Sequence, residues 1–171
     1  SLFSCLTEIK GIFGAPNILI NNAAIDSPPG SPKEETGPFE NYPEESWDKV
    51  IDVNLKGTFL ACQVFGAEMA KNNNGSIINI SSIYGLVSPD QSIYDFRRKK
   101  GEDFFKPVAY SASKSGILNL TRYLSSYWTK NNIRVNSLTI AGVFNNQDDE
   151  FLDAYCKRIP ICRMANSEEY N

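Results

Sequence analysis

Residues 76–82, Ser-Ile-Ile-Asn-Ile-Ser-Ser, form a short apolar run that ends in two serines. Two further runs of this kind occur, Asn-Ile-Leu-Ile-Asn at 17–21 and Ile-Arg-Val-Asn-Ser-Leu at 133–138. Short segments rich in Ile or Val and bounded by turn residues are typical of buried parallel strands. The sequence therefore predicts three strands.

Long segments with helical periodicity separate these strands. One spans about 43–72, with Glu44 and Glu45 in its opening turn, where carboxylates favour a helix N-terminus. The other spans about 109–131. This alternation of strands and helices predicts an α/β fold with a doubly wound parallel sheet. In such a sheet, the functional residues gather at the carboxyl ends of the strands.

The amino-acid composition excludes several kinds of catalytic and binding site. The 171 residues include 17 Lys and Arg against 20 Asp and Glu, with both signs interspersed, which argues against a nucleic-acid partner. The chain has no histidine, which excludes a Ser-His-Asp triad, a Cys-His pair and any histidine-containing metal site, and we expect no metal. A catalytic acid or base must then be Tyr, Lys, a carboxylate or Cys.

The length predicts one domain, residues 1–171, with enough apolar residues for a sizeable core. The four cysteines show no C-x-x-C spacing and are interpreted as reduced thiols. No apolar run approaches the roughly 18 residues of a membrane span, and no signal peptide is visible. We therefore expect a cytoplasmic protein without a membrane partner.

Tyr110 and Lys114 stand four residues apart in the second helical segment. Residues at this spacing share one helix face, so a phenol and an ammonium can approach one reacting atom. A nearby cation lowers the pKa of a tyrosine from its usual value of about 10, which makes Tyr110 a usable acid or base. Taken alone, the pair is more often a solvated helix face than a catalytic site.

Polar residues also follow the predicted strands. Ser81 and Ser82 close the second strand, where a hydroxyl could hold a substrate oxygen, and Asn21 and Asn22 close the first, ahead of small alanines. Asn54 is a polar residue inside an otherwise apolar helix, a position that usually faces solvent. A parallel sheet would bring these residues together, which favours a site.

The chain resembles the short-chain dehydrogenase/reductase superfamily. The resemblance rests on five segments in the family's order: NNAA at 21–24, VNLKGTF at 53–59, GSIINISS at 75–82, YSASK at 110–114 and IRVNSLT at 133–139. It implies a Rossmann fold, NAD or NADP as cofactor, and hydride transfer between an alcohol and a carbonyl compound. It also implies a homo-oligomer for the full-length parent.

The resemblance assigns roles by position. Tyr110 matches the acid/base, Lys114 its partner that lowers the tyrosine pKa and binds the nicotinamide ribose, and Ser82 the serine that bonds the substrate oxygen. Asn54 matches an asparagine that holds a water in the proton relay. Cofactor contacts are assigned to Asn21, Asn22 and Ala23, which support the sheet and line the adenosine side, and to Tyr110, Lys114 and Val143.

Two departures from the family concern loops. Residues 140–143, Ile-Ala-Gly-Val, lack the family's Pro-Gly after the third strand. The backbone of the loop around Val143 is therefore expected to be less rigid. An insertion at about 87–107 would lie over the substrate mouth. Its basic run at 97–100 could recognise an anionic or sugar-linked substrate, although a solvated basic face is the favoured interpretation.

The third departure is a missing glycine-rich turn after a first strand, which binds the pyrophosphate of a dinucleotide. The chain also ends just after a helix-start pattern at 167–169. We therefore expect a partial Rossmann domain, incomplete at both ends, that binds cofactor weakly by itself. Two alternatives stay open: a sugar-nucleotide epimerase or dehydratase, and a non-catalytic dinucleotide-binding or scaffold protein.

Overall fold

The computed structural model describes residues 1–26 and 32–170. Three strands form a parallel sheet in the order β1-β2-β3: β1 (Ile18–Asn21), β2 (Gly75–Ser82) and β3 (Ile133–Ile140). β1 aligns Ile18 with Ser76, and β2 aligns Gly75 with Ile133. The three predicted strands and the α/β class with a parallel sheet are thereby confirmed.

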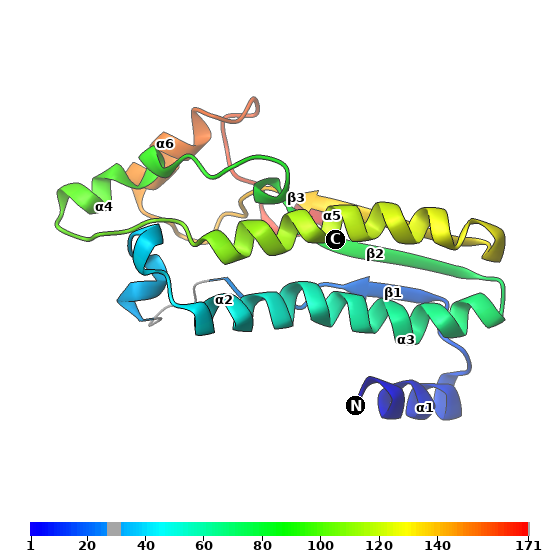
Figure 1. Cartoon of the computed structure of the whole chain (residues 1–171). Coiled ribbons are helices and arrows are strands. Elements are labelled where there is room, and N and C mark those ends of the chain that lie inside the picture. The colour runs from blue at the N-terminus through cyan, green and yellow to red at the C-terminus, as the bar shows by residue number, and fades with distance from the viewer. Residues whose placement is uncertain (27–31, 171) are drawn as a thin grey trace.

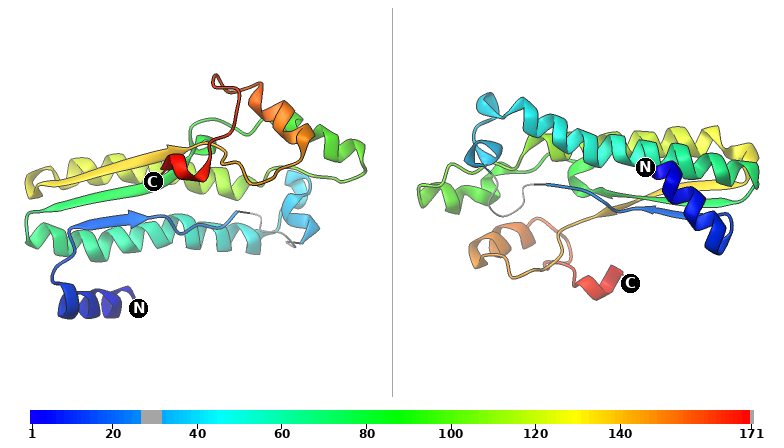
Figure 2. Two further views of the ribbon diagram at one scale, coloured as in Figure 1. Left: turned by 180° about the vertical axis from the view of Figure 1, so that it is seen from behind. Right: turned by 90° about the horizontal axis from the view of Figure 1, so that it is seen from below.

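Two long helical segments connect the strands. The first consists of α2 (Glu44–Ile51), a π-helical turn (Asp52–Lys56) and α3 (Gly57–Lys71), and the second is α5 (Val108–Tyr127). Figures 1 and 2 show α3 and α5 side by side on one face of the sheet. Both crossovers lie on that face because the strand order advances in one direction through β1, β2 and β3.

The remaining elements lie around this frame. α1 (Leu2–Phe13) packs near α3 and forms an ion pair from Lys10 to Glu68, whereas α4 (Asp95–Lys99) and α6 (Asp149–Cys156) lie beyond the carboxyl end of the sheet (Figure 1). Short 3-10 turns occupy Lys33–Thr36, Phe39–Asn41, Ile83–Gly85, Gln91–Tyr94, Thr129–Asn131 and Ser167–Tyr170. Within the described ranges, no helix has the length and apolar character needed to cross a membrane.

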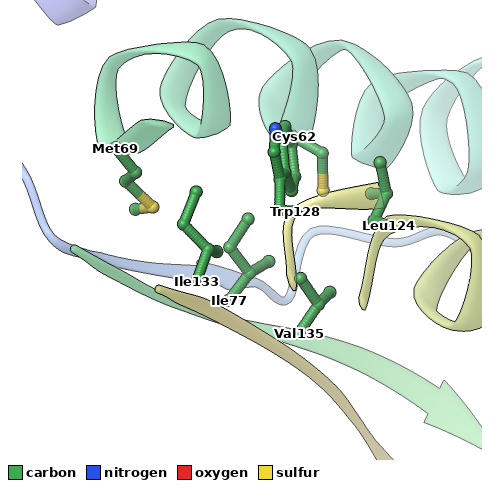
Figure 3. Close-up of a cluster of buried hydrophobic side chains, with 7 residues drawn as sticks. All are labelled: Cys62, Met69, Ile77, Leu124, Trp128, Ile133 and Val135. Atoms are coloured by element: carbon green, nitrogen blue, oxygen red, sulfur yellow. The ribbon is translucent and has the colours of Figure 1, made fainter. Parts of the chain in front are cut away.

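The main core lies between the sheet and the helices α3 and α5. Figure 3 shows its buried side chains: Cys62, Met69, Ile77, Leu124, Trp128, Ile133 and Val135. Gly66 of α3 allows the Trp128 indole to approach closely, because a Cβ atom there would lie 2.2 Å from a ring carbon. The opposite face of the sheet is open, since Ile18 and Ile20 are 63% and 57% exposed.

A second apolar cluster lies between the predicted insertion and α6. It contains the buried residues Ile93, Tyr94, Tyr155 and Met164. The Tyr94 ring lies 4.8 Å from the Phe104 ring and 5.7 Å from the Phe151 ring, measured between centroids. The insertion is therefore a packed layer beside the carboxyl ends of the strands.

Candidate active site

Tyr110 and Lys114 lie in the first turns of α5, close to the end of β2. The Lys114 side chain is buried, its Nζ donates a 2.8 Å hydrogen bond to the Ile80 carbonyl, and Nζ lies 5.6 Å from the Tyr110 ring centroid. Ser82, the last residue of β2, lines the same cavity as Tyr110. The structure thus brings together the three residues that carry the predicted chemistry.

Burial is the largest influence on the pKa values of this pair. Burial raises the pKa of the Tyr110 phenol, hydrogen bonding with the Ser82 side chain lowers it, and the negative charge of Asp26 raises it. Burial lowers the pKa of the Lys114 ammonium. The net direction is upward for Tyr110, and the predicted lowering of its pKa by Lys114 stays a prediction.

The two serines at the end of β2 have different surroundings. Ser81 is buried and donates its hydroxyl to the Lys114 carbonyl at 2.9 Å. Ser82 accepts a 3.2 Å hydrogen bond from the Tyr84 N–H, and its residue contributes to the cavity wall beside Tyr110. Ser82 is thus the serine available to a ligand, whereas Ser81 joins β2 to α5.

Gly85 holds the segment after Ser82 against α5. A Cβ atom at this position would lie 2.7 Å from the Lys114 carbonyl oxygen, closer than real side chains approach. The Ser115 hydroxyl donates a 3.0 Å hydrogen bond to the Gly85 carbonyl. The absence of a side chain here therefore fixes the distance between Ser82 and the helix that carries Tyr110.

Asn54 lies fully buried in the π-helical turn, a helix irregularity that often marks a functional site. Its Oδ1 accepts from the Ile25 N–H and its Nδ2 donates to the Ile25 carbonyl, both at 2.8 Å. Nδ2 also donates to Ser113 Oγ at 3.0 Å. The side chain thus fixes the segment after β1 against α5, and its role in holding a water stays a prediction.

Asn21 belongs to a chain of buried polar side chains beneath the helices. Its Nδ2 donates to Asn79 Oδ1 at 2.8 Å, and Asn79 Nδ2 donates to Thr121 Oγ1 at 2.9 Å. This geometry supports the sheet, as the resemblance implied for residue 21. Asn22 and Ala23 are exposed beyond the end of β1.

The loop after β3 is fixed without the family's proline. The Gly142 N–H donates to the Tyr155 hydroxyl at 2.8 Å, and the Phe144 N–H donates to the Ala165 carbonyl at 2.8 Å. Val143 lines the cavity. Its bridge to Ala165 is formed by the Phe144 N–H and the Gly142 carbonyl, and the Val143 N–H takes no part in it. Tertiary contacts therefore replace the rigidity that a proline would supply.

A cavity of about 290 Å³ lies where these elements meet. It is lined by residues from every segment that follows a strand, including Asp26, Ser82, Tyr110 and Val143, and by Lys106. A larger cavity of about 750 Å³ adjoins it across Tyr84 and Lys106 and contains neither Ser82 nor Tyr110. The smaller cavity is thus the candidate active site.

The basic run at 97–100 lies outside both cavities. Arg98 donates to the carbonyls of Phe104 and Gln91 at 2.7 and 2.6 Å, and Lys100 pairs with Glu150 at 2.8 Å. These contacts fold the insertion onto itself and onto α6. The cation that does reach the site is Lys106, whose only signal in the sequence is its position four residues before Tyr110.

The residues fit the nicotinamide end of the cofactor that the resemblance implies. Lys114 has three N–H donors but one hydrogen bond within the part of the chain that the structure describes, so donors remain for a ribose. Ala23 and Ala24 are exposed and small, which leaves the backbone beyond β1 accessible to a flat ligand. Val143 lines the cavity, and its N–H takes no part in the hydrogen bonds of the bridge to Ala165.

Comparisons with known proteins agree with this geometry. The family model described as enoyl-(acyl carrier protein) reductase matches residues 1–171. The chain is 34% identical over 134 residues to an NAD-dependent glycerol dehydrogenase of Listeria innocua, covering 78% of this chain and 44% of the relative. It is 30% identical over 174 residues to a D-threitol dehydrogenase of Mycolicibacterium smegmatis, covering 99% of this chain and 58% of the relative.

A solved structure shows the same arrangement of elements. The short chain dehydrogenase from Leptospira borgpetersenii with bound NAD+ superposes with a TM-score of 0.82 at 30% identity, covering 99% of this chain and 62% of that chain. The chain spans about half the length of the curated relatives it matches. Together with the meeting of Ser82, Tyr110 and Lys114 at the end of a parallel sheet, the comparisons show that the chain belongs to the short-chain dehydrogenase/reductase superfamily.

Proposed function

We propose that the protein transfers a hydride between a nicotinamide dinucleotide and an alcohol or carbonyl substrate, with Tyr110 as the acid and base. The observation that carries this proposal is the meeting of Tyr110 and Ser82 in one cavity at the carboxyl end of the sheet, with the buried Lys114 ammonium 5.6 Å from the Tyr110 ring centroid. Relatives named for glycerol and D-threitol oxidation support a small alcohol as the substrate.

Each residue has a separate part in this chemistry. In oxidation, the Tyr110 phenolate takes the hydroxyl proton of the alcohol, and in reduction the phenol returns a proton to the carbonyl oxygen. The Ser82 hydroxyl donates to the same oxygen and stabilises the charge that develops there. Burial of the site excludes water, which strengthens both contacts.

The cofactor is proposed to be NAD or NADP. Once bound, it would accept the hydride from the carbinol carbon in oxidation or supply it in reduction. Lys114 would hold the nicotinamide ribose, Val143 would offer its N–H to the carboxamide, and Asn22 and Ala23 would lie along the adenosine side. The NAD+ in the Leptospira structure supports a nicotinamide dinucleotide as the cofactor.

We also propose a cytoplasmic homo-oligomer. All four cysteines are free thiols, which supports a reducing compartment. Large apolar side chains are exposed on the outer surfaces of α3 and α5, among them Phe59, Tyr123 and Tyr127. Such exposed aromatic residues support an interface between copies of the protein.

The test is the substitution Tyr110→Phe in the full-length gene product. We expect turnover to fall by about 100-fold or more, because the acid/base is removed, with little change in cofactor affinity. The control is Tyr170→Phe, which removes a partly exposed phenol outside the cavity and outside the proposed interface and should leave turnover unchanged. Turnover is followed by NADH or NADPH absorbance, and affinity by fluorescence titration.

Full turnover in the Tyr110→Phe variant would contradict the proposed role. Cofactor binding without turnover in the unsubstituted protein, across alcohols and their carbonyl counterparts, would instead favour a non-catalytic dinucleotide-binding function.

A further inference from the structure

An ion pair between Asp26 and Lys106 forms one wall of the active-site cavity. Lys106 Nζ contacts Asp26 Oδ2, and the same Nζ lies 5.2 Å from the Tyr110 ring centroid. The Lys106 side chain is 16% exposed and that of Asp26 is 35% exposed, so both lie partly within the protein. The pair therefore lies beside the ring of the proposed acid and base.

The insertion holds Lys106 in this position. Gln91 Oε1 accepts from the Lys106 N–H at 2.9 Å, and Gln91 Nε2 donates to the Lys106 carbonyl at 3.2 Å. The side-chain amide of Gln91 thus forms hydrogen bonds with both backbone groups of Lys106, directly before α5 begins at Val108. Because the backbone is fixed at this point, the ammonium is directed toward Asp26.

The second carboxylate oxygen of Asp26 lacks a donor. Oδ1 is buried and has no hydrogen-bond partner among residues 1–26 and 32–170. A buried carboxylate oxygen without a donor is unfavourable, and it accepts strongly from any O–H or N–H that reaches it. Asp26 lines the cavity, so a bound ligand that displaces the groups covering this oxygen can supply that donor.

The charge of the pair limits the kind of donor. Lys106 balances the carboxylate, so the wall of the cavity offers no net positive charge to an anion. The unsatisfied oxygen of Asp26 is an acceptor, and the carboxylate would repel an anionic substrate group. A neutral hydroxyl satisfies it without adding a charge.

We propose that Asp26 is a specificity-determining residue that accepts a hydrogen bond from a second hydroxyl of the substrate. The substrate class is then a polyol or the corresponding hydroxy ketone, and not a monohydric or carboxylate-bearing alcohol. Lys106 acts as a positioning residue that orients the carboxylate. This inference rests on the proposed hydride transfer and adds the group by which the substrate is selected.

The experiment compares three secondary alcohols on a three-carbon skeleton in the full-length gene product: propylene glycol, isopropanol and lactate. We expect kcat/KM for propylene glycol to exceed that for isopropanol by about 10- to 100-fold, the effect of a hydrogen bond to a charged acceptor. In the Asp26→Ala variant, this ratio should fall to within about threefold of one. The control Glu40→Ala removes an exposed carboxylate of the larger cavity and should preserve the ratio.

A ratio of two substrates on one protein is insensitive to partial loss of folded enzyme. Where Asp26→Ala fails to fold, Asp26→Asn decides: it keeps an acceptor oxygen without the charge, so the ratio should fall by several-fold. An unchanged ratio in the folded variant, equal use of glycol and isopropanol, or a preference for lactate overturns the role of Asp26. Failure to oxidise any alcohol or reduce its ketone with either cofactor overturns the proposed function itself.

Discussion

The Tyr110 phenol lies among two cations and one carboxylate. Lys106 and Lys114 place their ammonium groups 5.2 and 5.6 Å from the ring centroid, and the Asp26 charge raises the phenol's pKa through space. Burial acts in the same direction as Asp26, and the contact with Ser82 acts against both. The proton affinity of this phenol is therefore set by residues from both sides of the cavity.

The substitution Asp26→Asn should move the pH profile of alcohol oxidation to lower pH. Oxidation needs the phenolate, and its rate rises as pH passes the Tyr110 pKa. The carboxylate disfavours the phenolate, so its removal lowers that pKa, and the unpaired Lys106 acts in the same direction. The measurement is kcat/KM for isopropanol against pH, and an unchanged or upward-shifted rising limb would contradict the argument.

The resemblance pointed to Tyr110, Lys114 and Ser82 because each belongs to a family motif within a helix or strand, whereas the Tyr-Lys spacing alone favoured a solvated helix face. Asp26 and Lys106 were missed because they lie 80 residues apart, outside any periodic segment, and meet only in the folded chain. The side-chain contacts of Asn54 were missed for the same reason, since the Ile25 backbone and Ser113 come from other segments.

Helix α3 approaches Trp128, the residue after the end of α5, closely at one glycine. The Trp128 indole occupies the space where a side chain at residue 66 would lie. Gly57, at the start of α3, has only an ordinary 3.5 Å contact near its Cβ position. The two glycines therefore allow helix propensity and packing to be separated on one helix.

The substitution Gly66→Ala should destabilise the protein by about 1–3 kcal/mol, because the methyl group displaces the indole from the core. The control Gly57→Ala should stabilise it by up to about 1 kcal/mol through helix propensity. Urea unfolding of the full-length gene product measures both free energies. A Gly66→Ala variant as stable as the unsubstituted protein would show that α3 and Trp128 are not tightly packed.

The helical segments were predicted from the sequence, but two features within and between them were not. The π-helical turn at Asp52–Lys56 leaves the apolar period nearly unchanged, so the pattern suggested one uninterrupted helix. The packing of the insertion on α6 depends on pairs such as Asp90 with Arg158, joined at 2.7 Å across 68 residues. Local sequence patterns carry no signal for contacts of this range.

In the molecule as a whole, we propose that the described chain supplies the substrate end of the site. None of β1, β2 and β3 is followed by a glycine-rich turn that leads into a helix, the arrangement that binds a pyrophosphate. The segments after the strands instead bear Ser82, Val143 and small alanines. The proposed contacts with the reacting end of a cofactor therefore lie in segments that lack a phosphate-binding turn.

The 171-residue polypeptide produced by itself should therefore bind NADH and NADPH weakly, without saturation at micromolar concentrations. The measurement is a fluorescence titration of the purified polypeptide, with circular dichroism to establish that it is folded. Saturable micromolar binding would show that the described residues suffice for the dinucleotide.

The hydrogen-bonded polar side chains of Asn21, Asn79 and Thr121 also affect the alignment in which the strands pair during folding. A shift of β2 by one residue would turn Asn79 to the open face and bring an isoleucine against the Asn21 amide. Apolar contacts alone would tolerate such a shift better, because Ile77, Ile78 and Ile80 are interchangeable in character. These polar side chains therefore favour one alignment of β1 and β2 over an alignment shifted by one residue.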